Sequence, residues 1–177
     1  MIIRKPLIAD IPEMARVHLE TWRTTYRGII ADSYLENLSL QKHIERQQKY
    51  MAMPGTSYSV AELEGKGIVG FLPGGPKRDD SFTQPGELYA INILEQHRRS
   101  GIGTAMVRQW AQDLRNARMN AGYLWVLADN KPAIAFYEKL GAKLQRQQMI
   151  EIGSQSLREL AYGWNDLRKL AGGRMEE

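Results

Sequence analysis

The sequence predicts one α/β domain built around a mixed β-sheet. Its 177 residues suit a single domain that buries a core of its own. Hydrophobic residues make up 43% of the chain and charged residues 25%, as in ordinary globular proteins. Strand-like and helix-like segments alternate in the order β-α-α-β-β-β-α-β-α-β-β, which is typical of an α/β fold.

The first part of the chain predicts a short strand followed by helices. Residues 2–5 have strand composition, and a helix follows that Asp10 can cap and that has Pro12 in its first turn. Residues 33–53 form a second helical stretch, and we expect it to break near Ser39.

The middle of the chain predicts a hairpin, a loop and a strand. Apolar and β-branched residues over 57–72 flank a glycine-containing turn at 64–67. Residues 74–86 hold two prolines and several glycines, so we expect an exposed connection there. Residues 87–94 then form a strand.

The last part predicts two helices and three strands. Residues 101–117 show an apolar helical stripe, and residues 122–128 form a buried strand. A helix then begins at Asp129 or Asn130 and ends before Gly141. Strands near 143–152 and 157–164 follow in sequence. The domain is expected to span residues 1–165, with a polar tail over 166–177.

Composition argues against several classes of protein. The chain has no cysteine, which excludes disulfides and thiolate metal sites, and His18, His43 and His97 lack metal-ligand spacing. No apolar run approaches the roughly 20 residues of a membrane helix, and the N-terminus does not resemble a signal peptide. We therefore expect a cytoplasmic protein without a metal.

The charge pattern favours a local anion site. The net charge is +4, and the basic residues are scattered, with the densest pair at Arg98 and Arg99. A nucleic-acid surface would instead cluster basic residues with aromatics between them. A nucleic-acid-associated protein therefore stays only as a minor alternative.

The stretch EQHRRSGIGTAM places two arginines and a Gly-x-Gly turn where a helix begins. The first N–H groups of a helix lack partners and lie at the positive end of its dipole, so they can bind a phosphate. Met106 replaces the last glycine of a dinucleotide fingerprint, and the Gly-Lys-Ser/Thr of a P-loop is absent. On this stretch alone, a purely structural turn remains an alternative.

Two motifs together resemble the GNAT superfamily of acyl-CoA-dependent N-acetyltransferases. The first has the form R-x-x-G-x-G and lies at residues 98–103. The second, about thirty residues later, has the form N-x-x-A-x-x-x-Y-x-K-x-G. Its residues are Asn130, Ala133, Tyr137, Lys139 and Gly141. The resemblance extends from residue 3 to about residue 164.

The resemblance implies a fold and an activity. It implies a mostly antiparallel central sheet flanked by helices, in which strands 87–94 and 122–128 splay apart. It also implies transfer of an acetyl group from acetyl-CoA to a primary amine, directly within a ternary complex and without a metal. The acceptor is a small molecule or a peptide, and a homodimer is compatible with the family. A non-catalytic acyl-CoA-binding regulator with the same fold is the main alternative.

The resemblance also assigns residues to coenzyme binding. The backbone of Ile91 and Ile93 would pair with the pantetheine arm, and Asn130 would reach the coenzyme, cap a helix, or do both. The pyrophosphate would lie on the turn formed by Arg98, Arg99, Ser100, Gly101, Ile102, Gly103 and Thr104.

Catalytic roles follow from the same resemblance. Tyr137 resembles the general acid that protonates the departing thiolate, although a core aromatic is the alternative. Glu87 is the first candidate for accepting the proton of the amine, Glu20 is the second, and either is equally compatible with a solvated carboxylate. Trp22, Tyr26 and Tyr34 would wall an acceptor pocket or belong to the core. Polyamines, amino acids, aminoglycosides and protein N-termini all remain open as acceptors.

The sequence departs from the family pattern in two places. Glu95 stands where relatives often have proline, and Ala142 follows Gly141 where they often have phenylalanine. Neither change touches the atoms expected to bind phosphate, although the Glu95 charge would weaken coenzyme binding slightly.

Overall fold

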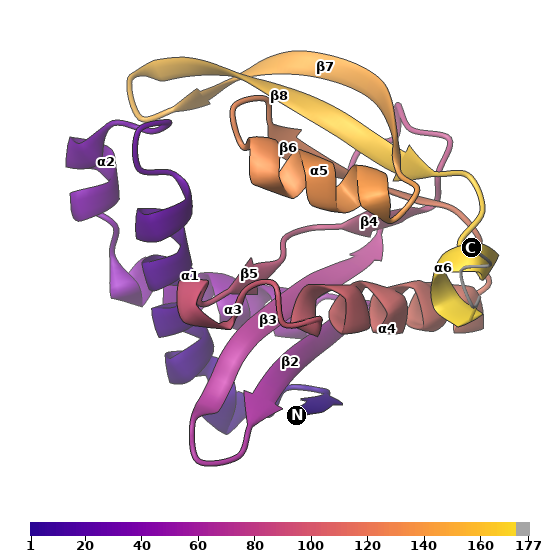
Figure 1. Ribbon diagram of the computed structural model, residues 1–177, viewed down its shortest axis with the longest axis horizontal. Coiled ribbons are helices and arrows are strands. Elements are labelled where there is room, and N and C mark those ends of the chain that lie inside the picture. Colours follow the sequence, from indigo (N-terminus) through magenta and orange to yellow (C-terminus); the bar gives the residue numbers. More distant parts are fainter. Residues whose placement is uncertain (173–177) are drawn as a thin grey trace.

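A computed structural model describes residues 1–172 of the chain as one mixed sheet with helices packed on it (Figure 1). The sheet has the order β1-β2-β3-β4-β6-β8-β7, and β5 pairs with β3. Every neighbouring pair is antiparallel except β4 and β6. The predicted mixed, mostly antiparallel α/β fold is therefore confirmed.

The elements follow the predicted order closely. The strands are β1 (Ile2–Arg4), β2 (Ser57–Leu63), β3 (Gly67–Pro76), β4 (Gly86–Leu88), β5 (Asn92–Ile93), β6 (Gly122–Leu127), β7 (Lys143–Ile152) and β8 (Gln155–Trp164). The helices are α1 (Ile11–Thr25), α2 (Asp32–Glu36), α3 (Leu40–Ala52), α4 (Ile102–Asn116), α5 (Lys131–Lys139) and α6 (Arg168–Gly172). Two short 3-10 turns are η1 (Ile8–Asp10) and η2 (Glu95–His97).

Helices α1 and α4 cover opposite faces of the sheet. Val60 and Phe71 belong to the buried cluster that contains Met14 of α1. Their strand neighbours Ala61 and Leu72 belong to the larger cluster, which is built around α4. Because successive strand residues point to opposite faces, this alternation places one helix on each side of the sheet.

The two central strands separate after a short parallel contact. Strands β4 and β6 pair only at Gly86 with Gly122 and at Glu87 with Tyr123. Beyond that point β5 pairs with β3 alone, so the predicted splay is confirmed. The continuous strand expected over 87–94 is wrong, because the chain leaves the sheet between Leu88 and Asn92. The N–H groups of Tyr89 and Ala90 both bond to the Pro73 carbonyl, which marks a local bulge.

Three smaller expectations need correction. The predicted loop over 74–86 is shorter, since β3 runs through Pro76. Asp10 does not cap α1, because its carboxylate accepts hydrogen bonds from Arg4 and from the Leu7 N–H. The segment expected as a polar tail contains α6, where Leu170 is buried against α4. Residues 173–177 of that tail lie outside the described residues.

A buried polar cluster joins α1 to α3. His18 and His43 are 3% and 5% exposed, and their ring centroids lie 4.3 Å apart. Gln47 Nε2 donates to His18 Nδ1 at 3.2 Å, and the Tyr58 hydroxyl donates to Gln47 Oε1. Burial, helped by the charge of Arg46, lowers the pKa of His18 to about 2 and that of His43 to about 4. Both histidines are therefore neutral in the folded protein at neutral pH.

This cluster predicts a loss of stability in mild acid. An unfolded histidine has a pKa near 6.5. Below that pH the unfolded state binds protons that the folded state does not bind, because the pKa values of its buried histidines are lowered. The free energy of unfolding should fall by roughly 2 kcal/mol per histidine between pH 7 and pH 5. Urea denaturation at a series of pH values measures the decrease.

Two leucine variants test whether the buried histidines cause this decrease in the free energy of unfolding. His43→Leu removes one titrating group, so it should reduce the decrease in the free energy of unfolding by about half. His97→Leu, at a half-exposed position on η2, should leave the decrease unchanged. An equal decrease in both variants would assign the pH dependence to other groups.

Candidate active site

The turn before α4 has the backbone of an anion site. Gly101 has a φ of +86°, and Arg99 has a φ of +58°, so the chain reverses sharply before the helix starts. No side chain caps the first turn of α4, which leaves its first N–H groups directed away from the helix. A Cβ built on Gly101 would meet no atom within 4 Å. The space beside these N–H groups is therefore open to a ligand.

Arg98 fixes this turn to two other elements. Its Nε donates to the Ile93 carbonyl at 3.1 Å, and its Nη2 donates to the Thr25 hydroxyl at 2.7 Å. The side chain thus ties the turn to β5 and to the end of α1. This geometry favours a positioning role for Arg98, with ligand contacts left to the backbone.

Gly103 serves a packing need at the same place. A Cβ built there would lie 3.1 Å from the Phe136 ring and 3.3 Å from Ile93 Cδ1. Only a residue without a side chain lets the start of α4 approach both α5 and β5 so closely. Gly103 therefore sets the position of the helix start, while the open space lies at Gly101.

The separation of β4 and β6 leaves one edge of β5 without a partner strand. The Leu94 N–H bonds to the Val69 carbonyl of β3, so by strand alternation the Ile93 N–H faces the opposite edge. The Ile93 carbonyl on that edge is occupied by Arg98. Ile91 lies in the bulge outside both strands and packs against the core.

Tyr137 and Asn130 lie at the neighbouring helix, α5. Asn130 is 8% exposed and caps α5 by accepting the Ala133 N–H at 3.3 Å. Tyr137 is 5% exposed, and its hydroxyl makes no hydrogen bond to any residue from 1 to 172. Burial, together with nearby Tyr26, raises the pKa of the Tyr137 phenol above its usual value. The phenol is therefore protonated at neutral pH and free to donate.

Glu87 lies in a buried ion pair. Its side chain is 3% exposed and forms two contacts with the Arg78 guanidinium, at 2.5 Å and 3.1 Å. The Arg78 N–H and the Tyr123 hydroxyl donate to the same carboxylate at 2.9 Å and 3.0 Å. Since donors already occupy both oxygens, the geometry favours a positioning role over the predicted proton relay. Glu20, the second candidate, is exposed on α1.

Known proteins of one family are similar to this chain in sequence. The sequence model of the acetyltransferase (GNAT) family matches residues 18–142. The N-acetyltransferase YuaI from Bacillus subtilis (strain 168) is 34% identical over 168 residues, which cover 95% of each chain. The chain belongs to the GNAT acetyltransferase family. It is therefore an acetyltransferase that uses acetyl-CoA as its donor substrate.

Solved structures agree with this family fold. The ribosomal-protein-alanine N-acetyltransferase from Brucella melitensis aligns with a TM-score of 0.73 at 20% identity, over 93% of this chain and 99% of that one. The PaiA N-acetyltransferase from Thermoplasma acidophilum, solved in complex with coenzyme A, aligns with a TM-score of 0.69 at 21% identity. That alignment covers 89% of this chain and 96% of PaiA.

The three predicted acceptor aromatics of this acetyltransferase lie together. Trp22, Tyr26 and Tyr34 are half-buried in one apolar cluster beneath the β7–β8 hairpin. Trp22 and Tyr26 meet edge to face, with ring centroids 4.9 Å apart. Burial raises the pKa of the Tyr26 phenol, and the Asn130 side chain lowers it to a smaller extent. Tyr26 also packs with Leu127, three residues before the Asn130 cap of α5.

Sequence reasoning missed two charged residues on this face. The sequence predicts only an exposed loop around Arg78, yet the Arg78 side chain forms the ion pair with Glu87. The sequence predicts only a strand residue at Glu159. In the structure Glu159 is half-buried on β8 and accepts a hydrogen bond from Gln148 Nε2 at 2.6 Å. A lone carboxylate in an alternating strand looks solvent-exposed in the sequence, so no local signal marks it.

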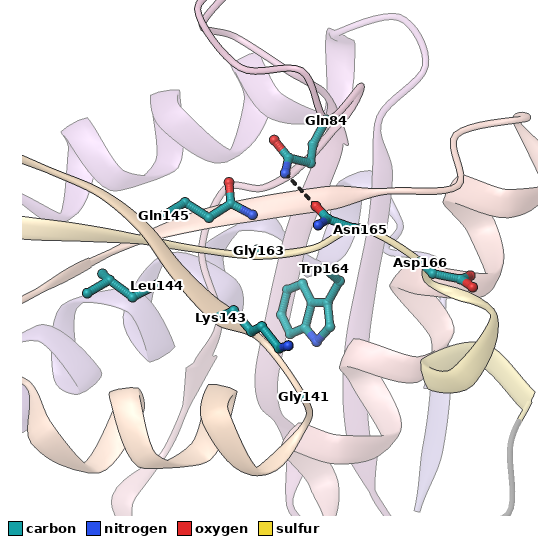
Figure 2. Close-up of a pocket in the computed structure, with 9 residues that line it drawn as sticks. All are labelled: Gln84, Gly141, Lys143, Leu144, Gln145, Gly163, Trp164, Asn165 and Asp166. Atoms are coloured by element: carbon teal, nitrogen blue, oxygen red, sulfur yellow. Dashed lines mark hydrogen bonds between the residues drawn. The ribbon is translucent and has the colours of Figure 1, made fainter.

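A separate cavity of about 500 Å³ lies away from these residues (Figure 2). Gly141, just past the C-terminal end of α5, borders it, whereas Asn130 and Tyr26 lie at the N-terminal end. In Figure 2 Gln84 and Asn165 close one side through a hydrogen bond of 3.0 Å. Its lining residues are Gln84, Gly141, Lys143, Leu144, Gln145, Gly163, Trp164, Asn165 and Asp166. We do not assign this cavity to the acetyl-transfer site.

Metal clusters and membrane-spanning helices are both absent from the part of the chain that the structure describes. Within residues 1–172, no three histidine, cysteine or acidic side chains gather in a way that could hold a metal ion. None of the helices in that range combines the length and the apolar character needed to cross a membrane.

Proposed function

We propose that this protein transfers the acetyl group of acetyl-CoA directly to a primary amine while both substrates are bound. The observation that carries the proposal is that the uncapped start of α4 lies against both β5, which has one open edge, and α5, which bears Tyr137. A Cβ at Gly103 would meet Ile93 of β5 and Phe136, the neighbour of Tyr137 on α5. The coenzyme complex of the similarly folded PaiA supports a coenzyme role for this arrangement.

The residues of the turn suit the pyrophosphate of the donor. Backbone N–H groups of the Arg98–Thr104 turn would hold it, with the helix dipole adding attraction. Charge-assisted hydrogen bonds contribute roughly 1.5–3 kcal/mol each, so several of them outweigh the dipole contribution of about 0.3–2 kcal/mol. The Ile93 N–H would then pair with an amide of the pantetheine arm, as a peptide pairs with a sheet edge.

Two proton transfers define what the side chains must do. A free alkyl amine has a pKa near 10.4, so only about one molecule in a thousand is neutral at pH 7. A group on the acceptor side must therefore take a proton before the amine attacks. Tyr137 would give its proton to the thiolate as the bond between carbon and sulfur breaks.

The acceptor itself is proposed only as a class. The cluster of Trp22, Tyr26 and Tyr34 would form the apolar wall of the acceptor site, with the β7–β8 hairpin above it. The Brucella neighbour acts, by its name, on an alanine of a ribosomal protein, which makes peptide α-amines one arm of the test. Homodimer formation stays a prediction that sedimentation velocity can check.

A turnover screen tests the proposal. Thiol release from acetyl-CoA is followed with peptides bearing a free α-amine, amino acids, polyamines and aminoglycosides as acceptors. At least one amine class should raise the rate well above hydrolysis without an amine. Coenzyme A binding by calorimetry without turnover of any amine would instead support the non-catalytic regulator.

A charge placed at the start of α4 tests the coenzyme site separately. Thr104 occupies the third position of α4, where a glutamate side chain reaches back to the free N–H groups and suits the helix. Thr104→Glu should therefore fold normally but weaken coenzyme A binding by about 10- to 100-fold, because its carboxylate competes with the phosphate. Calorimetry gives the dissociation constant.

The matched control is Thr104→Gln, which has nearly the same size and shape without the charge. It should bind coenzyme A much more tightly than Thr104→Glu. Equal affinities in the two variants would contradict a phosphate at this turn.

A further inference from the structure

Two carboxylates face the acceptor side of the sheet near its centre. Glu87 on β4 pairs with Tyr123 of β6, and the Tyr123 hydroxyl donates to it. Glu159 on β8 lies two residues before Ala161, which packs in one cluster with Tyr123 and Phe82. Because side chains two apart in a strand share a face, Glu159 lies on the same face as Glu87.

The position of Glu159 along the sheet is also informative. It pairs with Leu127, the last residue of β6, and the adjacent Ala128 N–H bonds to the Arg158 carbonyl at 2.8 Å. The chain then enters the Asn130 cap of α5, the helix that bears Tyr137. Glu159 therefore lies at the end of β6 from which the Tyr137 helix starts.

The two carboxylates differ in how they are paired. Glu87 has two contacts with the Arg78 guanidinium and two further hydrogen bonds, from the Arg78 N–H and the Tyr123 hydroxyl. Glu159 forms no ion pair with any residue from 1 to 172, and its described hydrogen bond comes from the neutral amide of Gln148. The nearby Arg146 on β7 is engaged instead with Ser81 and the Phe82 ring. Glu159 is therefore the carboxylate on this face whose charge is uncompensated.

The surroundings of Glu159 favour the binding of a cation. Burial raises the pKa of the Glu159 carboxyl, and the charge of Glu87 raises it further. Tyr26 packs in one apolar cluster with Leu127, the strand partner of Glu159. An ammonium group bound beside Glu159 would supply the missing pairing and offset the repulsion from Glu87.

We propose that Glu159 binds the ammonium group of the acceptor and takes its proton, an inference that rests on the proposed acetyl transfer. The carboxylate accepts one proton from the ammonium and, being half-exposed, passes it to solvent. The neutral nitrogen forms the new bond to the acetyl carbon, the bond from that carbon to sulfur breaks, and Tyr137 protonates the thiolate. The nitrogen loses its second proton as the amide forms, which restores the phenol through solvent. One proton leaves per turnover.

Glu159→Gln tests this role because it keeps shape and hydrogen bonding but removes the basic site. The probe is the fastest amine of the acceptor panel, measured at saturating acetyl-CoA. At pH 7, kcat/KM for the amine should fall by about 100-fold or more. The deficit should shrink as pH approaches the pKa of that amine, about 7.7–8.0 for a peptide α-amine and about 10.4 for an alkyl amine, where the neutral amine is already present in solution.

Control variants separate this role from a structural one. Glu151→Gln, an exposed glutamate on β7, should leave kcat/KM within about threefold of the wild type. Glu159→Asp keeps the charge and should retain the wild-type shape of the pH profile at a lower rate. Coenzyme A affinity and thermal stability should be unchanged in all three.

The experiments distinguish a failure of the Glu159 role from a failure of the proposed acetyl transfer. A Glu159→Gln deficit that is equal at every pH, or no larger than that of Glu151→Gln, overturns the Glu159 role while leaving acetyl transfer intact. A wild-type protein that acetylates no amine of the panel overturns the proposed function, and the Glu159 role with it.

Discussion

Replacing Tyr137 with phenylalanine is expected to lower kcat by about 100- to 10,000-fold, which is the usual contribution of a positioned general acid. This corresponds to roughly 3–5 kcal/mol of transition-state stabilisation. The substitution removes only a hydroxyl that has no hydrogen-bond partner within residues 1–172, so the packing against Phe136 and Trp164 should survive. Single-turnover rates with acetyl-CoA and an active amine measure the loss.

Tyr162→Phe is the matched control. The Tyr162 hydroxyl donates to Glu138 Oε1 at 2.9 Å, so its removal should lower the melting temperature with a near-normal kcat. Tyr137→Phe should give the opposite pattern, with a normal melting temperature and unchanged coenzyme A affinity. A Tyr137→Phe rate within about threefold of the wild type would exclude the acid role.

Replacing Arg78 with methionine is expected to lower the free energy of unfolding by about 3 kcal/mol, the low end for breaking a buried pair. The low end applies because the Arg78 side chain is 42% exposed, whereas the Glu87 side chain left without a cation is only 3% exposed. For a chain of this size, the melting temperature should fall by about 6–12 °C. Differential scanning calorimetry gives the value.

Two further variants identify the unpaired charge as the cause. Arg78→Met combined with Glu87→Gln removes the buried charge and should recover part of the lost stability. Arg168→Met breaks an exposed pair with Asp166 and should cost much less stability than Arg78→Met. If Arg78→Met were no more harmful than Arg168→Met, an unpaired Glu87 charge would not be the cause of the lost stability.

The Glu87→Gln single variant also decides between the two roles considered for this residue. A positioning residue predicts a wild-type pH profile for kcat/KM with a lower melting temperature. A proton relay predicts a rate deficit that is greatest at neutral pH and recovers at high pH.

Local features of the sequence were sufficient for the elements that carry the motifs. The apolar stripe of α4, the glycine-containing turn before that helix and a cap at Asn130 of α5 all agree with the sequence prediction. Each depends on residues within a turn or two of the chain, where propensity, capping and glycine geometry act. The family and its acetyl donor were implied by the resemblance of the two motifs to the GNAT superfamily.

Only the tertiary structure decided how distant side chains meet. The Arg98 side chain binds the Thr25 hydroxyl, 73 residues earlier in the chain, and no local pattern marks that contact. Strand 87–94 was expected to be continuous, yet two of its N–H groups turn to the Pro73 carbonyl of β3. Glu87 forms an ion pair with Arg78, whereas Glu159, on another strand, forms no ion pair with the described residues. Strand composition does not reveal which groups the neighbouring strands will bring, because pairing and charge compensation depend on the register and topology of the sheet.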